Sequence, residues 1–177
     1  MILSPRVRKF ALAVHLTFSV GWIGAALAYV ALGVAARSSE DTQTVRSSWI
    51  AMETIGWYVI VPLALGSLLT GLVMALGTKW GLIRYYWVLF AFVLTTLATV
   101  VLLLHMPDVT SVTDVARRAD GTALDQLGGD LLHATLGVAV LVVILVLNIY
   151  KPPGMTRYGW RRQNQREQTA SRTTHSP

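Results

Sequence analysis

The sequence predicts an all-α protein, a polytopic transmembrane four-helix bundle with both termini cytoplasmic. Of its 177 residues, 54% are hydrophobic and only 14% are charged, whereas a typical soluble domain is about 25% charged. A soluble protein of this size could not bury so much apolar surface in one core, so the expected solvent is lipid. The chain has no cysteine, which excludes disulfides and thiolate chemistry.

Four segments without Lys, Arg, Asp or Glu predict the four helices. Each has at least the roughly 20 residues that a helix needs to cross about 30 Å of hydrocarbon. A helix is also the structure that satisfies the backbone of a lone segment in lipid. The expected spans are 10–36, 54–78, 85–107 and 131–150.

The elements follow in chain order. The first span begins with the basic stretch RVRK, as a signal peptide does, but its apolar part is longer than the roughly 7–15 residues of a signal h-region, so we expect a retained helix. Pro62 predicts a kink in the second span. The first external connection, over 37–53, is expected to be a short polar loop. The second, over 108–130, is either a short interfacial helix or an acidic linker.

Basic residues predict the orientation of the bundle. Eleven of the 15 Lys and Arg residues flank the span ends on the side that holds both termini: Arg6, Arg8, Lys9, Lys79, Arg84, Lys151, Arg157, Arg161, Arg162, Arg166 and Arg172. The other four are Arg37, Arg46, Arg117 and Arg118. By the positive-inside rule, both termini are expected to be cytoplasmic in a multi-pass membrane protein.

The chain is expected to divide into a transmembrane domain, 1–153, and a basic tail, 154–177. The tail is polar, and disorder is expected after about Arg162. Its cations favour contact with anionic lipids of the inner leaflet. Nucleic acid is not an expected partner, because nothing organises these arginines into a site. Besides the lipid bilayer, a membrane protein partner or a second copy of the chain stays open as a partner.

His15 is the deepest ionisable group in the predicted spans. Such groups are rare and costly in lipid, so each is a functional hypothesis. His15 lies about 9 Å into the membrane, and Ser19 and Trp22 share its helix face. Met74 in the second span lies at a similar depth, and a His–Met pair is a known haem ligation. The alternative is a histidine bonded to a backbone carbonyl or to water.

A second group of polar residues is expected at the external ends of the spans. It consists of Glu53, His105, Asp130 and His133. Two histidines on facing helices can ligate haem iron, and with a carboxylate they can bind zinc or copper. A proton relay and a set of hydrated interfacial side chains are the other interpretations.

Small residues recur at helical spacing in three spans. These are Gly24 with Ala28, Ser67 with Gly71 and Ala75, and Gly137 one turn after His133. Such stripes let membrane helices approach closely, and clearance for a flat macrocycle is the alternative. Other chemistry finds little support, since there is no phosphate-binding glycine motif, no serine with a base at matching height, and no inverted repeat. No catalytic residue is assigned.

Four stretches carry a resemblance to a known family: HLTFSVGWIGAAL, LTGLVMALGTKWGL, HATLGVAVLVV and NIYKPPGMTRYG. Together they resemble an uncharacterised, chiefly actinobacterial family of predicted integral membrane proteins with a four-helix domain of unknown function. The resemblance covers nearly the whole chain except the polar tail, and it implies an inner-membrane location without an assigned activity.

His15 followed by Trp22 in a first span is more loosely similar to two other groups. These are the copper-resistance membrane domains and the membrane-bound protoporphyrinogen oxidases, which are four-helix haem b proteins. The second resemblance implies that His15 is the haem ligand. The lysine that this oxidase uses in its third span has no counterpart here, because that span offers only Arg84 at its start.

The leading interpretation is a small membrane redox protein that binds b-type haem or a transition metal. Cofactor binding is expected at His15, Trp22 and Met74, and metal binding at the external group. One alternative is a non-enzymatic membrane subunit or scaffold that packs against a partner protein. The other is copper or small-solute handling through the external histidines and carboxylates.

Overall fold

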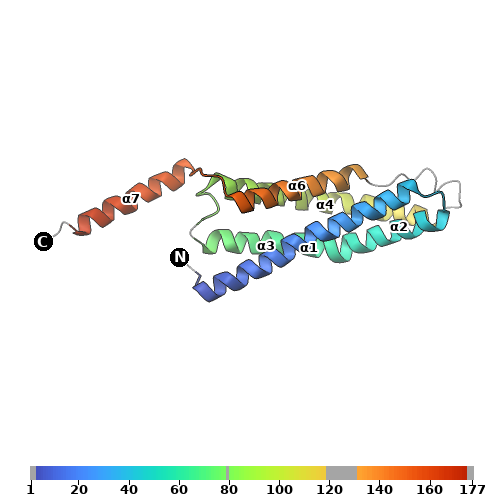
Figure 1. Ribbon diagram of the computed structural model, residues 1–177, viewed down its shortest axis with the longest axis horizontal. Helices are drawn as coiled ribbons and strands as arrows, with labels where there is room; N and C mark the ends of the chain where they lie inside the picture. Colours follow the sequence, from blue (N-terminus) through green and yellow to red (C-terminus); the bar gives the residue numbers. More distant parts are fainter. Residues whose placement is uncertain (1–2, 79, 119–130, 175–177) are drawn as a thin grey trace.

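The computed structural model describes residues 3–78, 80–118 and 131–174, and these ranges are helical with short connections. Figure 1 shows the long helices side by side, with one further helix projecting from an end of the bundle. The elements are α1 (Pro5–Ser38), α2 (Thr42–Ile55), the π-helical η1 (Gly56–Ile60), α3 (Val61–Gly77), α4 (Tyr86–Arg118), α6 (Leu131–Tyr150) and α7 (Arg157–Thr174).

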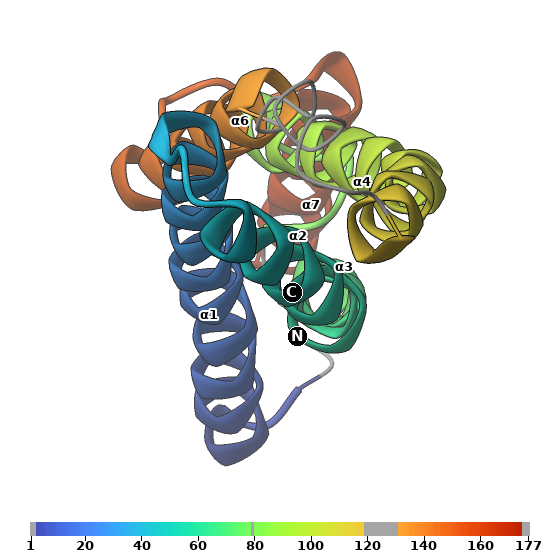
Figure 2. The ribbon, with the colours of Figure 1, turned by 90° about the vertical axis from the view of Figure 1, so that its right-hand side faces the viewer.

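Four helical rods in the described ranges are long and apolar enough to cross a membrane. They are α1, the continuous run α2–η1–α3, α4 and α6. The prediction of an all-helical chain with four helices long and apolar enough to span a membrane is therefore confirmed for the described ranges, and it is consistent with a multi-pass membrane protein. The rods form a ring in which α1 and α4 each contact both α3 and α6, as the end-on view in Figure 2 shows.

Many apolar side chains point outward from the rods. Phe10 is 70% exposed, Leu69 63% and Leu104 72%. Large exposed apolar surface of this kind is compatible with contact to a lipid bilayer rather than water. The helix faces that point inward form a core around Trp22, Ala64 and Leu141.

The second helical rod begins earlier than the sequence predicted. Helix α2 starts at Thr42, so the expected polar loop over 37–53 is wrong and the connection is only a few residues long. The carboxylate of Asp41 caps α2 by accepting hydrogen bonds from the amides of Gln43 and Thr44, at 3.3 and 3.0 Å. Val45, Trp49 and Met52 then form a buried stripe at helical spacing.

The third rod also continues further than predicted. Helix α4 passes through Pro107 and ends at Arg118, so the helix continues beyond the predicted span 85–107. Residues 108–118 extend α4 instead of forming a linker or a separate interfacial helix, and 119–130 lie outside the described residues. Val109, Thr113 and Ala116 carry the buried face of α4 past the proline and against α2. A proline removes one backbone hydrogen bond, which this packing offsets.

A π-helical turn precedes Pro62. Proline has no amide proton and clashes with the carbonyl four residues earlier, and the wider turns of η1 lie directly before it. Gly56 begins this segment, and a Cβ atom there would lie only 2.6 Å from Cε of the buried Met106. The absence of a side chain at Gly56 therefore leaves room for the Met106 side chain of α4.

The rods differ in length. Helix α4 has 33 residues, about 50 Å, and α1 is similar, whereas the 20 residues of α6 span about 30 Å. In Figure 1, α6 stops short of the end where α1 joins α2. We call the projecting part, formed by α2 with the ends of α1 and α4, the far extension. The opposite end, where α1 begins and α6 ends, is called the basic end.

The chain beyond α6 is docked to the basic end. The amide of Tyr86 donates to the carbonyl of Gly154 (3.2 Å), and the amide of Thr156 donates to the carbonyl of Arg84 (3.0 Å). The Thr156 hydroxyl donates to the carbonyl of Ile83 at 2.6 Å. Helix α7 then runs to Thr174 where the sequence predicted disorder after Arg162.

Candidate functional site

A cavity lies between α1, α3, α4 and α6 in the half of the bundle nearer the basic end. Its volume is about 620 Å³, within the roughly 300–1,000 Å³ of small-molecule sites. His15 is one of its lining residues, and we call it the His15 cavity. Trp22 and Met74 line it too, so the three residues predicted to bind a cofactor share one cavity.

The His15 ring is held by its neighbour on α3. Its Nδ1 atom lies 3.0 Å from the hydroxyl oxygen of Thr70, and that hydroxyl donates its single proton to the carbonyl of Gly66 at 2.6 Å. Thr70 must therefore accept a hydrogen bond from the Nδ1–H of His15. This tautomer leaves Nε2 with a lone pair. The absence of a side chain at Gly71 leaves room for the ring, because a Cβ there would lie 3.2 Å from its Cε1.

The remaining predicted residues of this face are also positioned by the α1–α3 contact. The hydroxyls of Ser19 and Ser67 lie 2.8 Å apart. Trp22 is 4% exposed and joins the core. Met74 lies one helical turn after Thr70 on α3, and it also lines the cavity.

Helix α4 lies opposite α1 in the ring of rods, since each of the two contacts both α3 and α6. The described lining residues of α4 are Trp87, Val88, Ala91, Phe92 and Thr95. None of these side chains carries an imidazole or a thioether. The arrangement around the cavity therefore offers one strong ligand for a metal centre, His15, and Met74 on a neighbouring wall.

The external histidines also come together. The rings of His105 on α4 and His133 on α6 are stacked, with centroids 4.5 Å apart and planes 25° apart. The nitrogen lone pairs of an imidazole lie in the ring plane, so those of stacked rings run side by side instead of converging on one ion. This geometry suits contact between α4 and α6 better than haem ligation by both rings.

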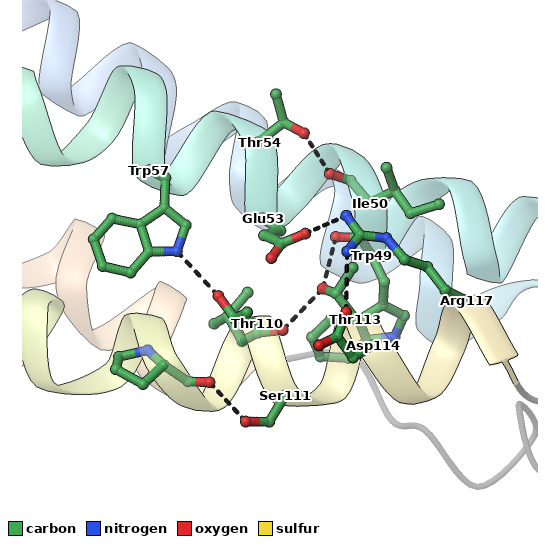
Figure 3. A network of polar contacts seen from close by, with 12 residues as sticks. Trp49, Ile50, Glu53, Thr54, Trp57, Thr110, Ser111, Thr113, Asp114 and Arg117 are labelled. Carbon is green, nitrogen blue, oxygen red and sulfur yellow. Dashed lines mark hydrogen bonds and ion pairs between the residues drawn. The ribbon is translucent and has the colours of Figure 1, made fainter.

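Glu53 is engaged elsewhere. Its carboxylate forms an ion pair with Arg117 at 2.6 Å, and Arg117 also contacts Asp114 at 3.0 Å. Figure 3 shows this network tying α2 to the end of α4, with the Trp57 indole donating to the Thr110 hydroxyl at 3.0 Å. Arg117, the ion-pair partner of Glu53, was not among the residues predicted for this site.

The predicted external metal cluster is not assembled by the described part of the chain. Among residues 3–78, 80–118 and 131–174, no three His, Asp or Glu side chains are grouped so that they could hold a metal ion. Asp130 lies outside the described residues.

Some glycines of the small-residue stripes lie against a neighbouring helix, and others do not. A Cβ at Gly24 or at Gly137 would meet nothing within 4 Å, so these two glycines do not create a close helix contact. Gly71 does, against His15. Gly66, which the stripes did not include, lies under the ring of Phe18, where a Cβ would come within 2.5 Å of ring carbons.

Sequence reasoning missed Thr70 and Lys151 as residues of the site. Thr70 lies eight residues before the end of the second predicted span, a depth similar to that of His15, so antiparallel depth matching could have found it. Lys151 was used only as one of the basic residues that predict the orientation of the bundle, although it lines the mouth of the His15 cavity.

No family model, curated protein or solved structure matches this chain. The site is therefore interpreted from its own geometry.

Proposed function

We propose that this chain is a small membrane haem protein in which His15 ligates the iron of a b-type haem inside the His15 cavity. The observation that carries the proposal is the hydrogen bond between His15 Nδ1 and Thr70 in the wall of a ligand-sized cavity. Histidines that bind a metal use one nitrogen as the ligand and donate the other N–H to a fixed partner. Bound haem would supply one-electron transfer.

The residues present fit a flat, largely apolar ligand. Around His15 the cavity is lined by aromatic and aliphatic side chains, including Trp22, Phe92 and Leu141. The apolar lining would exclude water from the ligand, and Thr70 would keep the imidazole in the tautomer with a free Nε2. His15 is the only protein ligand in this proposal, and Met74 contributes to the wall.

The test is an absorption spectrum of detergent-purified protein from haem-supplemented cells, oxidised and then reduced with dithionite. We expect a Soret band that shifts on reduction and is lost in His15→Ala. Thr70→Val removes the Nδ1 partner with little change in volume, and its spectrum should show weakened haem binding. The matched control is Thr96→Val, because the Thr96 hydroxyl donates only to the carbonyl of Phe92 within its own helix and Thr96 does not line the cavity.

Two outcomes would reject this function. A colourless protein favours the non-enzymatic membrane subunit or scaffold instead. A Soret band that survives His15→Ala unchanged and disappears in His105→Ala would move the haem to the external histidines.

The orientation is part of the same proposal. The chain would lie in the bacterial inner membrane with its basic end in the cytoplasm, as the charge distribution favours. On α7, Arg161 and Arg162 are exposed, as are the aromatic rings of Tyr158 and Trp160. Cations beside interfacial aromatic residues support contact of this helix with anionic inner-leaflet lipids.

A further inference from the structure

The His15 cavity changes in character from its mouth to its interior. At the mouth, near the basic end, it is lined by Arg8, Lys9 and Lys151. His15 lies about 9 Å further along α1 from Lys9, and the deepest part is formed by apolar residues such as Trp22 and Leu141. None of the described lining residues is acidic, so the mouth presents positive charge towards whatever enters the cavity.

Lys151 occupies its place at the mouth in an unusual backbone conformation. Its φ is +45°, and it is the one non-glycine residue with positive φ in the part of the chain that the structure describes. It directly follows the last residue of α6, where helices commonly have glycine because a Cβ is strained there. Strain of this kind in a cavity wall suggests that the side chain itself has a function.

The Lys151 side chain is directed by an aromatic cluster. Its ammonium lies 5.6 Å from the centroid of the Trp80 ring, a distance at which a cation is attracted to the face of an indole. Trp80 packs edge-on against Trp87, with centroids 5.4 Å apart. Trp80 and Trp87 also line the cavity, so this cluster fixes the charge at the mouth.

We propose that the mouth of the His15 cavity binds the propionate carboxylates of the haem, with Lys151 as the principal contact and Arg8 and Lys9 beside it. This inference rests on the proposed function, and it assigns an orientation to the haem in the cavity. The carboxylate edge faces the basic end, and the apolar edge points towards Trp22.

The test is a titration of the apoprotein in detergent with two probes, haemin and its dimethyl ester, in which both carboxylates are masked. Wild type should bind haemin at least 10-fold more tightly than the diester. Lys151→Gln should weaken haemin binding about 10-fold and leave diester binding unchanged. Arg161→Gln is the matched control, because it removes a cation from α7 and should change neither affinity.

A second variant separates binding from folding. Lys151→Gly removes the ammonium but suits the positive φ, so its apoprotein should unfold at the same or a higher temperature than wild type while haemin binding falls as in Lys151→Gln. Equal wild-type affinity for both probes, or haemin affinity unaffected by Lys151→Gln, overturns the inference and leaves haem binding intact. Failure of wild type to bind either probe overturns the proposed function and this inference with it.

Discussion

Single glycines in the helices have different roles that their spacing does not reveal. A Cβ at Gly66 would lie 2.5 Å from the Phe18 ring, whereas one at Gly24 would meet nothing within 4 Å. Both glycines lie in apolar helices of the bundle. Only the first is needed for two helices to approach each other, because the Phe18 ring of α1 occupies the space where a side chain on α3 would be.

Gly66→Ala should destabilise the bundle by about 1–3 kcal/mol, the usual cost of overpacking a well-packed contact. Gly24→Ala is the matched control and should be neutral or slightly stabilising, because alanine is the better helix former. Unfolding of both variants by titration with SDS gives the free energies. Equal destabilisation by the two substitutions would contradict the α1–α3 contact described above.

Asp41 gives the start of α2 a pH dependence. The hydroxyl of Thr44 donates to its carboxylate at 2.7 Å, and this bond, followed by the amides of Thr44 and Gln43, lowers the pKa of Asp41. Because the pKa in the folded state is depressed, the stabilising cap is fully present above the ordinary aspartate pKa of about 3.9. It is lost as the pH falls through the lower, folded value.

An NMR titration of the Asp41 carboxyl carbon should therefore show a midpoint below that of an unstructured aspartate. In Thr44→Ala the midpoint should rise towards the ordinary value, because the largest cause of the shift is removed. Thr42→Ala serves as the control, since the side chains that donate to Asp41 do not include Thr42. A midpoint that does not respond to Thr44→Ala would show that this hydroxyl bond is absent in solution.

At the scale of the elements, the segment after α6 is attached to the loop before α4. Tyr85 and Met155 form an isolated antiparallel bridge, and Thr156 caps α7 by accepting a hydrogen bond from the amide of Gly159 at 3.1 Å. A Cβ at Gly159 would lie 2.5 Å from the carbonyl oxygen of Arg84. A backbone atom cannot move aside as a side chain can, so this contact requires glycine.

Gly159→Ala should therefore release the start of α7 from the loop. The amides of Tyr86 and Thr156, which are bonded across the contact, should exchange with deuterium at least 10-fold faster. Gly154→Ala is the control, because its Cβ would make only an ordinary 3.6 Å contact with Tyr86. Unchanged exchange in Gly159→Ala would contradict the attachment.

Most of the helical layout could be predicted from hydropathy, because lipid leaves a backbone few alternatives to a helix. The fourth apolar segment coincides with α6, the first lies within the longer α1, and the other two overlap longer helical rods to within one residue at one end. Hydropathy did not predict the start of α2 and the end of α4, because these helices continue beyond the apolar runs. What indicates a helix there is a stripe of buried residues at helical spacing: Val45, Trp49 and Met52 on α2, and Val109, Thr113 and Ala116 on α4.

For the candidate site, depth along each helix could be predicted but rotation about the helix axis could not. Depth grouped His15 with Met74, helical spacing placed Trp22 on the same face of its helix as His15, and all three residues line one cavity. Rotation depends on the packing of neighbouring helices. It decides that Glu53 meets Arg117, that the His105 and His133 rings stack, and that Thr70 faces His15.

At the scale of the whole molecule, the absence of cysteine makes the orientation testable by labelling single introduced thiols. On intact spheroplasts, a membrane-impermeant maleimide should label Ser39→Cys, between α1 and α2. It should label Gln165→Cys on α7 only after lysis. The reverse pattern would place the basic end outside and contradict the orientation proposed from the charges.

The far extension has a practical consequence. Three of the rods exceed the thickness of a hydrocarbon layer by about 20 Å, and the ion pair of Glu53 with Arg117 fastens two of them to each other there. A 19.4 kDa chain with most of its mass inside a detergent micelle is too small for particle images to be aligned by electron microscopy. The far extension would project from the micelle, so an antibody fragment bound to it would add the mass needed for alignment.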